Sequence, residues 1–397
     1  MVLKAFKLRL YPNKTQRNQI HVNFGCARFV WNQMLNMHIE RYKNNKKAKF
    51  QGRYSMDVML KALKIEYPWL KQAESTSLQR VNRDLDDAFQ RFFNPDLQNG
   101  FPRFKSKKNT NQSYTSKFVN NNIRIVDEHH IKLPKLGLVY FKAGRILNGK
   151  IRAVTVSVNS RKQYQASILV EGENQTFKKT KKSVGIDLGL KSLTVTSDGQ
   201  KEDILKVDDG LNKQLRIWER KKSRRYENAK KAMAFDEHDK VLFPRTDLKQ
   251  FPRYQQAVRT VAKLKKHIAE RRRDNLHKLT TRLVKDYDTI VVENLSVKNM
   301  MKNHHLSASI ANASWGTLIS QLKYKCAWYG KKLIIIDPKN TSRICHECKQ
   351  KNHEFDSLSQ SEWLAAREWD CPNCHAHLDR DVNAAKNILA KGLETLS

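Results

Sequence analysis

The sequence predicts a multidomain α+β protein: a small N-terminal β-barrel that carries a helical insertion, then a layered α/β domain that carries a metal-binding lobe. Four observations lead to this prediction. Apolar residues keep helical spacing between residues 13 and 91, short alternating runs follow from residue 118, and strands alternate with helices from residue 183. Two C-x-x-C pairs near the C-terminus mark the lobe.

The first predicted strand lies in residues 1–12, where apolar and basic side chains alternate. The insertion, residues 13–117, is expected to contain helices, with a basic break at 44–49 and an ordered loop over 94–117. Residues 118–177 are expected to supply the rest of the barrel, because short strand-like runs there are separated by Gly, Pro, Asn and Asp. These runs cover residues 123–126, 130–133, 138–141, 153–158 and 164–170.

A basic linker at residues 178–182 precedes the α/β domain, whose first part covers residues 183–340. The metal lobe is predicted as an insertion over residues 341–377, and the domain closes with a C-terminal helix over 378–397. Residues 233–256 contain two prolines and no clean period, so we expect a loop there. Expected strands cover 184–187, 193–197, 289–292 and 333–337, and expected helices cover 216–232, 257–287 and 314–329.

The charge balance narrows the possible function classes. Seventy-six Lys and Arg residues against thirty-nine Asp and Glu residues leave a formal net charge of +37. A hydrophobic content of 39% is too high for a disordered basic tail, no apolar run is long enough to cross a membrane, and six cysteines are too few for a disulfide scaffold. We therefore expect a folded cytoplasmic protein, with no membrane partner, whose positive charge is neutralised by a polyanion such as nucleic acid.

The two cysteine pairs, Cys345-x-x-Cys348 and Cys371-x-x-Cys374, are separated by 22 residues. Each turn presents two thiolates to one ion, and two turns close a site without an open position for water, so we expect one structural Zn²⁺. A redox pair is the weaker alternative, because a thioredoxin-like motif needs a single pair on a βα unit. Four nearby histidines, each expected to be exposed, are the other candidate ligands: His346, His353, His375 and His377.

Three acidic residues stand where buried apolar elements begin or end. Asp187 follows a predicted strand, Glu293 follows the apolar run 290–292, and Asp381 opens the C-terminal helix. Carboxylates in such positions hold two Mg²⁺ ions about 4 Å apart in sites that cleave phosphodiesters. Each acid alone also has an ordinary explanation, as a turn aspartate, a helix-entry acid or a helix N-cap. Asp379 competes with Asp381, which we prefer because it leads directly into the helix.

Basic residues gather in three stretches, at 178–182, 216–225 and 263–273. A solvated helix face explains any one of them, whereas all three together with the net charge favour a nucleic-acid channel. The candidate nucleic-acid contacts are Lys178, Lys179, Lys181, Lys182, Arg224, Arg225, Arg271, Arg272 and Arg343. Five aromatic side chains lie among basic residues and could stack on bases: Trp31, Tyr42, Tyr54, Phe101 and Phe104. Core packing is the alternative for Trp31.

Five motifs, in this order, resemble the TnpB family of proteins, which are encoded by insertion sequences and related to the type V CRISPR effector nucleases. The motifs are Gly185-Ile186-Asp187-Leu188-Gly189, Val292-Glu293-Asn294-Leu295, Thr341-Ser342-Arg343-x-Cys345-x-x-Cys348, Cys371-Pro372-x-Cys374 and Asp379-Arg380-Asp381-Val382-Asn383-Ala384-Ala385. The resemblance covers nearly the whole chain. It departs from the family at two residues: glycine often follows each cysteine pair, but Lys349 and His375 stand there in this sequence. It also departs in length, in the stretches 233–256 and 357–367.

The resemblance implies a RuvC-like, RNase H-type nuclease domain, and a wedge-like barrel whose helical insertion serves recognition. It implies Mg²⁺-dependent cleavage of double-stranded DNA beside a short transposon-associated motif, directed by a guide RNA from the transposon end, at the nucleoid of a prokaryotic cell. By motif position, the catalytic and Mg²⁺-binding acids fall on Asp187, Glu293 and Asp381. The implied zinc ligands are Cys345, Cys348, Cys371 and Cys374.

Two other function classes remain open from the sequence. One is a guided DNA-binding regulator or transposition accessory protein that does not cut. The other is a transposase that uses the same three-acid chemistry to join DNA strands. The products separate the classes, because the first leaves DNA intact, the second joins ends, and a nuclease leaves breaks.

Overall fold

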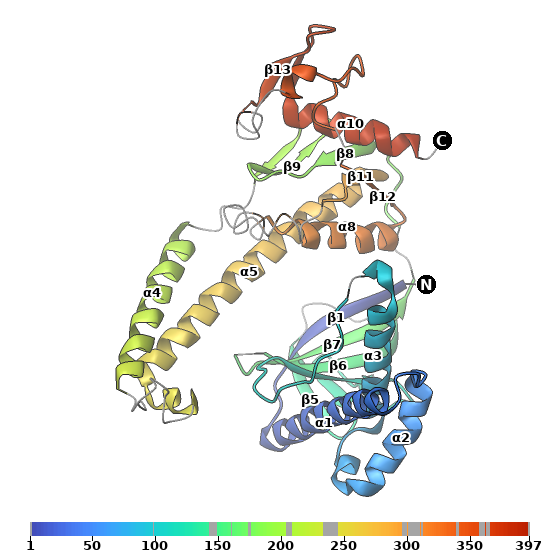
Figure 1. The fold of residues 1–397 in the computed structure, drawn as a ribbon, viewed down its shortest axis with the longest axis vertical. Coiled ribbons are helices and arrows are strands. Elements are labelled where there is room, and N and C mark those ends of the chain that lie inside the picture. Colours follow the sequence, from blue (N-terminus) through green and yellow to red (C-terminus); the bar gives the residue numbers. More distant parts are fainter. Residues whose placement is uncertain are drawn as a thin grey trace. The chain divides into compact units, whose positions relative to one another are not determined.

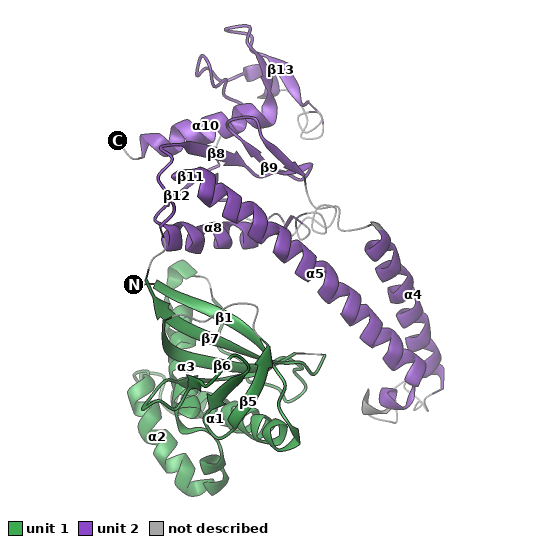
Figure 2. Cartoon of the chain, turned by 180° about the vertical axis from the view of Figure 1, so that it is seen from behind, with its two compact units in different colours: residues 1–173 green, residues 174–397 purple. Residues whose placement is uncertain are grey.

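The computed structural model describes residues 2–97, 99–142, 149–159, 161–173, 176–203, 209–232, 245–295, 300, 310, 313–338, 341–356, 362 and 366–395. The chain forms two compact units, residues 1–173 and residues 174–397 (Figure 2). Both mix helices with a sheet, as the sequence predicted. Within the described ranges, no helix has the length and apolar character that a membrane span requires.

Unit 1 combines one seven-stranded sheet with a layer of helices (Figure 1). Its elements are β1 (Val2–Leu10), α1 (Lys14–Asn44), α2 (Arg53–Glu66), η1 (Pro68–Gln72), α3 (Ser75–Phe93), η2 (Pro95–Leu97), β2 (Gln112–Lys117), β3 (Arg124–Ile125), β4 (His130–Leu133), β5 (Gly137–Lys142), β6 (Lys150–Val158) and β7 (Tyr164–Gly172). The strand order is β2-β6-β7-β1-β5-β4-β3, with antiparallel pairs throughout. The N-terminal strand therefore lies between two strands that follow the helical insertion.

Strand β2 corrects the loop predicted over residues 94–117, because its six residues pair with β6. The sequence Gln-Ser-Tyr-Thr-Ser-Lys has one large apolar residue, so no alternation is readable in it. Tyr114 and Ser116 nevertheless point inward and are buried. The Ser116 hydroxyl donates at 2.9 Å to the buried carboxylate of Glu74, which also accepts from two backbone N–H groups at the start of α3. Tertiary contacts with α3 and β6 thus define this edge strand.

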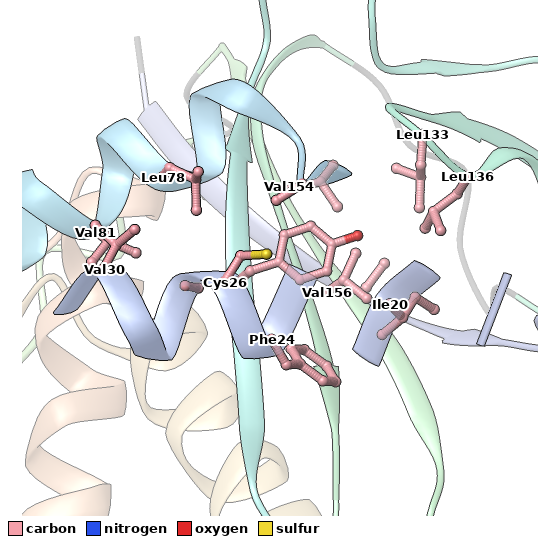
Figure 3. Close-up of a cluster of buried hydrophobic side chains, with 14 of the residues drawn as sticks. Ile20, Phe24, Cys26, Val30, Leu78, Val81, Leu133, Leu136, Val154 and Val156 are labelled. Carbon is pink, nitrogen blue, oxygen red and sulfur yellow. The ribbon is translucent and has the colours of Figure 1, made fainter. Parts of the chain in front are cut away.

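Helices α1 and α3 bury their apolar faces against this sheet (Figure 3). Phe24 and Val30 of α1, Leu78 of α3, and Val154 and Val156 of β6 are all buried in the same cluster. The three helices lie where the helical spacing of apolar residues predicted them, and the basic break separates α1 from α2.

Unit 2 contains a five-stranded sheet in the order β10-β9-β8-β11-β12. Its elements are β8 (Ser183–Asp187), β9 (Ser192–Thr196), β10 (Lys201–Asp203), α4 (Asp209–Lys231), η3 (Arg245–Gln250), α5 (Pro252–Asp286), β11 (Thr289–Glu293), α8 (Trp315–Tyr329), β12 (Lys332–Ile336), η4 (His353–Asp356), β13 (Glu368–Asp370), β14 (His377–Asp379) and α10 (Arg380–Glu394). Strands β8, β11 and β12 are parallel, and β9 and β10 are added antiparallel.

Strand β11 is buried on both faces, as its continuous apolar run predicted. Ile290 and Val292 pack in one cluster with residues of α5 and α8, whereas Val291 packs in another with Ile388 of α10. The sheet therefore lies between α10 on one face and α5 with α8 on the other (Figure 1).

Helices α4 and α5 pack side by side as a hairpin, and both begin earlier than the sequence predicts (Figure 1). The expected starts were residues 216 and 257, whereas α4 begins at Asp209 and α5 at Pro252. Proline suits the first helical turn, because its missing N–H would have no partner there and its φ is already helical. The predicted loop over 233–256 is therefore shorter, and its first twelve residues lie outside the described residues.

Gly185 in β8 lies against α10. A Cβ atom at this position would stand 2.1 Å from the carbonyl oxygen of Ala385 and 2.6 Å from the backbone nitrogen of Leu389. Because these atoms belong to a helix backbone, we expect Gly185→Ala to lower the free energy of unfolding by about 3 kcal/mol, the upper end for overpacking. Urea unfolding of the full chain measures this change. Gly316→Ala is the control, since its Cβ would meet nothing within 4 Å, and equal stability of the two variants would contradict the prediction.

Candidate functional site

Parallel pairing brings Asp187 and Glu293 to one edge of the sheet in unit 2. Ile186 pairs with Val292 in register, so the two acids that follow them lie at the carboxyl ends of neighbouring strands. Helix α10 packs on β8 and carries Asp381 in its first turn. Burial, followed by the charges of Glu293 and Asp381, raises the pKa of Asp187 to about 7. Asp187 is therefore within electrostatic reach of the other two acids.

Asp381 has two arginine partners that the sequence prediction missed. Arg380 donates from Nη2 to Asp381 Oδ1 at 3.0 Å, and Arg367 donates from Nη1 to Oδ2 at 3.3 Å. Arg380 is buried and also donates to the carbonyl oxygen of Ala366 at 3.0 Å. Its charge lowers the pKa of Asp187, against the larger effect of burial. The position of Arg380 between two acids was the one signal for it in the sequence.

Glu293 is held by a hydroxyl group on the segment that leads into the cysteine lobe. The Glu293 carboxylate is buried and accepts a hydrogen bond from Thr341 Oγ1. Burial raises the pKa of Glu293 above its ordinary value, and this hydrogen bond offsets part of the increase. The Thr341 carbonyl accepts in turn from Asn387 Nδ2 of α10 at 2.9 Å. Helix α10 therefore holds Thr341, and Thr341 holds Glu293.

Asp379 has a different place from Asp381. Its carboxylate accepts from the backbone N–H groups of Asp381 at 3.0 Å and Val382 at 2.9 Å, which makes it the N-cap of α10. It also pairs with Lys201 at 2.5 Å. The helix-cap explanation considered for Asp381 thus applies to Asp379.

The four cysteines of the lobe form one cluster, whose sulfur atoms all lie within 4.8 Å of one another. Cys345 Sγ lies 3.7 Å from Cys374 Sγ, and Cys348 Sγ lies 3.6 Å from Cys371 Sγ. Four Zn–S bonds of about 2.3 Å in a tetrahedron place sulfurs roughly 3.8 Å apart, so the cluster fits one zinc ion. It is a closed, all-sulfur donor set, which suits a structural metal.

His346 was expected to be exposed, and the structure corrects this. Only 12% of its side chain is exposed. Its ring contacts Asn383 Oδ1 at 3.0 Å through Nδ1 and Lys386 Nζ at 2.8 Å through Nε2, so it docks the lobe onto α10. The other three histidines are exposed as expected, and the metal-binding group contains none of the four.

The residues after the two cysteine pairs, where the family often has glycine, keep the conformation that favours glycine. Lys349 has a φ of 63° and His375 a φ of 58°. Both backbone N–H groups close the turn onto a cysteine carbonyl: Lys349 N donates to Cys345 at 3.0 Å, and His375 N donates to Cys371 at 2.8 Å. The turn geometry is therefore retained without the glycine, at the cost of a left-handed conformation for a residue with a Cβ.

We expect Lys349→Gly and His375→Gly each to stabilise the lobe by about 1 kcal/mol, because glycine adopts this conformation without the steric penalty. The measurement is zinc release to a chelator, which should be slower in both variants than in the parent chain. Lys351→Gly is the control, because Lys351 is not among the residues with positive φ. Faster zinc release from both glycine variants would show that the side chains themselves hold the turns.

Family comparisons match three regions of the chain. A helix-turn-helix domain (HTH_OrfB_IS605) matches residues 1–47, a probable transposase (OrfB_IS605) matches 167–304, and a Cas12f1-like TNB domain matches 315–388. A protein of Streptomyces pristinaespiralis named "Putative RNA-guided DNA endonuclease" is 33% identical, across 99% of this chain and 90% of its own length. The chain belongs to the TnpB family. In this TnpB-family chain, residues 2–47 form strand β1 and helix α1 followed by a short non-helical segment.

Three further comparisons give lower sequence identities. InsQ of Escherichia coli K12, also named a putative RNA-guided DNA endonuclease, is 30% identical over 100% of this chain and 94% of its own. The TnpB-like protein L79 of Acanthamoeba polyphaga mimivirus is 24% identical over 54% of this chain. A solved Cas12f1–sgRNA–target DNA complex has a TM-score of 0.56 at 14% identity, with 98% of each chain covered, which shows a shared fold.

The candidate nucleic-acid contacts of this TnpB-family chain lie mainly on two features. Lys178, Lys179, Lys181 and Lys182 are exposed on a linker whose backbone is held by Asp288, which accepts from two N–H groups of the linker. The hairpin carries the four predicted arginines of α4 and α5, which are Arg224, Arg225, Arg271 and Arg272.

Some of the predicted basic residues are only partly exposed. Arg225 donates to the carbonyl oxygen of Arg253 at 2.7 Å and lies over the ring of Trp218. Burial lowers the pKa of Arg272, which is half-buried, as is Arg343. Arg225 therefore ties α4 to α5, whereas Arg224 and Arg271 are exposed.

Among the aromatic candidates, Trp31 packs in the core, which was the alternative to stacking on a base. It is buried, its Nε1 donates to the carbonyl oxygen of Arg103 at 3.0 Å, and Lys105 Nζ lies 3.6 Å from its ring centre. The other four are exposed, namely Tyr42, Tyr54, Phe101 and Phe104.

Proposed function

We propose that this chain is an RNA-guided, Mg²⁺-dependent endonuclease with a RuvC-like, RNase H-type active site. It would cut double-stranded DNA of the nucleoid beside a short transposon-associated motif, using RNA from the end of its insertion sequence. The observation that carries this proposal is the parallel pairing that brings Asp187 and Glu293 to neighbouring strand ends, with Asp381 near enough for its charge to raise the pKa of Asp187. The predicted domain limits belong to the same proposal, except that the wedge-like barrel of residues 1–12 and 118–177 also takes in strand β2, residues 112–117.

The side chains of the three acids are of the type that binds divalent cations. They offer only carboxylate oxygens, the donors that Mg²⁺ prefers, from Asp187, Glu293 and Asp381. Mutual repulsion contributes to the raised pKa of Asp187, and a bound cation would relieve it. Two Mg²⁺ ions held there would supply a hydroxide nucleophile and stabilise the leaving oxygen. The neighbouring Arg380 and Arg367 would orient Asp381.

The surplus charge supports an RNA partner in addition to DNA. Ordinary DNA sites use roughly six to ten phosphate contacts, far fewer than the net charge of +37. A guide scaffold together with an RNA–DNA hybrid offers many more phosphates. Base pairing supplies the sequence specificity in such a complex, so the protein needs mostly contacts with the backbone.

Purification with co-bound RNA tests the proposal. Sequencing should find a constant scaffold followed by a variable 3′ segment, and the complex should cut a plasmid that carries the matching target and a randomised flank. Cleavage should stop with EDTA and return with Mg²⁺. Guided binding without a product would favour the non-cutting regulator, and joined ends would favour strand transfer.

We expect Thr341→Val to lower the cleavage rate about tenfold or more, while RNA loading stays unchanged. The change removes the hydroxyl that donates to Glu293 but keeps the side-chain shape, and a hydrogen bond to a charged group is worth about 1.5–3 kcal/mol. Thr341→Ser should retain most of the rate, because it keeps the donor. An equal loss in both variants would assign the effect to packing.

A further inference from the structure

The helical layer of unit 1 encloses a cavity of about 710 Å³ between the C-terminal ends of α1 and α3. Its volume lies in the range of small-molecule sites. Seven aromatic rings line it, and we call it the aromatic cavity: His38, Tyr42, Phe50, Phe89, Phe92, Phe93 and Phe101.

The rings are arranged for stacking and remain open to a ligand. The ring of His38 stacks on Phe50, with centroids 4.8 Å apart and planes at 27°. Phe93 stacks on Phe89 with planes at 23°, and 52% of Phe93 is exposed. Phe101 packs edge-on against Phe89 and is 45% exposed. A flat apolar ligand could therefore extend either stack.

The rim of the aromatic cavity is positive. Arg41, Lys43 and Lys49 line it and are exposed, and no carboxylate is found among its described lining residues. Glu40 pairs with Lys43 at 2.9 Å on the exposed helix surface, but such pairs contribute only about 0.2–0.5 kcal/mol. An occupant with planar apolar rings and negative charge complements this lining, whereas an apolar peptide would leave the cations unused.

His38 is among the rings that line the aromatic cavity. Its Nε2 atom is buried and has no hydrogen-bond partner in the described part of the chain. Burial, and then the charge of Arg41, lowers the pKa of His38, and the charge of Asp86 opposes this shift. Because Nε2 is closed to a ligand, the exposed aromatic faces and the positive rim supply the recognition, and His38 contributes its ring to the lining.

We propose that the aromatic cavity binds an unpaired nucleobase of single-stranded RNA or DNA. The base would stack on the exposed face of Phe93 and place its phosphates near Arg41 and Lys49. Bases inside a duplex are already stacked, so the ligand is a base in a loop, at an end or in a displaced strand. The inference rests on the proposed function only in that nucleic acid is the partner.

Short single-stranded RNA and DNA oligonucleotides that contain 2-aminopurine test the proposal on the full chain without a guide. Stacking should quench 2-aminopurine fluorescence, and Phe93→Leu should weaken binding about tenfold, the scale of one lost base–aromatic stack. Phe93→Trp should retain binding and quenching. Tyr140→Leu removes a partly exposed ring on β5, outside the aromatic cavity, and should bind like the parent chain. Comparing the two oligonucleotides identifies the preferred strand.

Equal affinity and equal quenching in all four proteins would overturn the proposal. It would also be overturned if Phe93→Leu changed only the sedimentation of the protein, because the aromatic cavity would then be an interface between copies. Guided plasmid cleavage is measured separately. Loss of quenching with guided cleavage intact would count against the aromatic cavity alone, whereas quenching without guided cleavage would count against the proposed function alone.

Discussion

Alanine in place of Asp187 or of Glu293 is expected to lower DNA cleavage about a thousand-fold, equivalent to about 4 kcal/mol of transition-state stabilisation. Each change removes carboxylate oxygens from the edge of the sheet where the three acids meet. Bound Mg²⁺ would lose a ligand, and the spacing of the metal site would be lost with it. Single-turnover cleavage of a labelled target by the guided complex measures the effect.

DNA binding should survive these changes, because repulsion in the acid cluster opposes folding. The pKa of Asp187 is raised to about 7, so its ionised form is disfavoured in the folded protein. Such an acid lowers the free energy of unfolding once the pH exceeds its ordinary pKa. This destabilisation reaches its full size when the pH exceeds the raised pKa of the folded protein. Asp187→Asn should therefore unfold no more easily than the parent chain at pH 8. Its guided binding of DNA should equal that of the parent chain.

Asp274→Asn is the matched control for both changes. Asp274 lies on α5, is 65% exposed in its side chain and pairs with Lys278 at 2.8 Å, so its loss should leave the cleavage rate unaltered. Undiminished cutting by Asp187→Ala and Glu293→Ala would remove the active-site assignment. Loss of binding together with cutting would assign these acids to the fold.

Cys345→Ser is expected to release the zinc ion, unfold the lobe and lower cleavage at least a hundred-fold. Cys345 is fully buried, and the hydrophobic cluster of the lobe is small. A core of this size depends on its metal, since zinc binding in small finger-like domains is worth about 10 kcal/mol or more. The lobe should therefore become protease-sensitive while the rest of the chain stays folded.

The loss of cleavage follows from how the lobe contacts α10 and Glu293. The carbonyl oxygen of Ile344, next to Cys345, accepts from Asn383 at 2.8 Å and from Asn387 at 2.6 Å. Asn387 also holds the Thr341 carbonyl, and Thr341 donates to Glu293. An unfolded lobe would release this chain of hydrogen bonds and leave Glu293 without its donor, although all three acids are intact.

Zinc per chain, measured by elemental analysis, and cleavage rate are the two readouts. Cys326→Ala is the control, because Cys326 is buried in α8 and lies outside the four-cysteine cluster. It should keep one zinc per chain and the parent rate. Full zinc content and full cleavage in Cys345→Ser would contradict both the ligand assignment and the link to Glu293.

Elements that are buried on two faces or along one helical stripe could be predicted from the sequence. β11 ends one residue beyond its expected limit, because burial on both faces demands apolar side chains along the strand. β12 is shifted by one residue from its expected limits, and three of its apolar side chains are only half-buried. β2 could not be predicted, since an edge strand takes its pairing from β6 and its burial from α3. The early start of α5 was hidden by a proline that usually ends helices.

For the candidate site, the identity of the metal-binding groups could be read from residue type and spacing. Thiolates in two C-x-x-C turns select zinc, and surplus positive charge selects a polyanion, because both are properties of side chains wherever they lie. The meeting of Asp187, Glu293 and Asp381 required the tertiary structure, since residues almost 200 positions apart become neighbours only through the pairing of β8 with β11 and the packing of α10. The residues that hydrogen-bond to these acids also required the tertiary structure. Arg380, Arg367 and Thr341 reach these acids because the fold places them within hydrogen-bond distance, and hydrogen bonds depend on distance and angle, which no linear pattern contains.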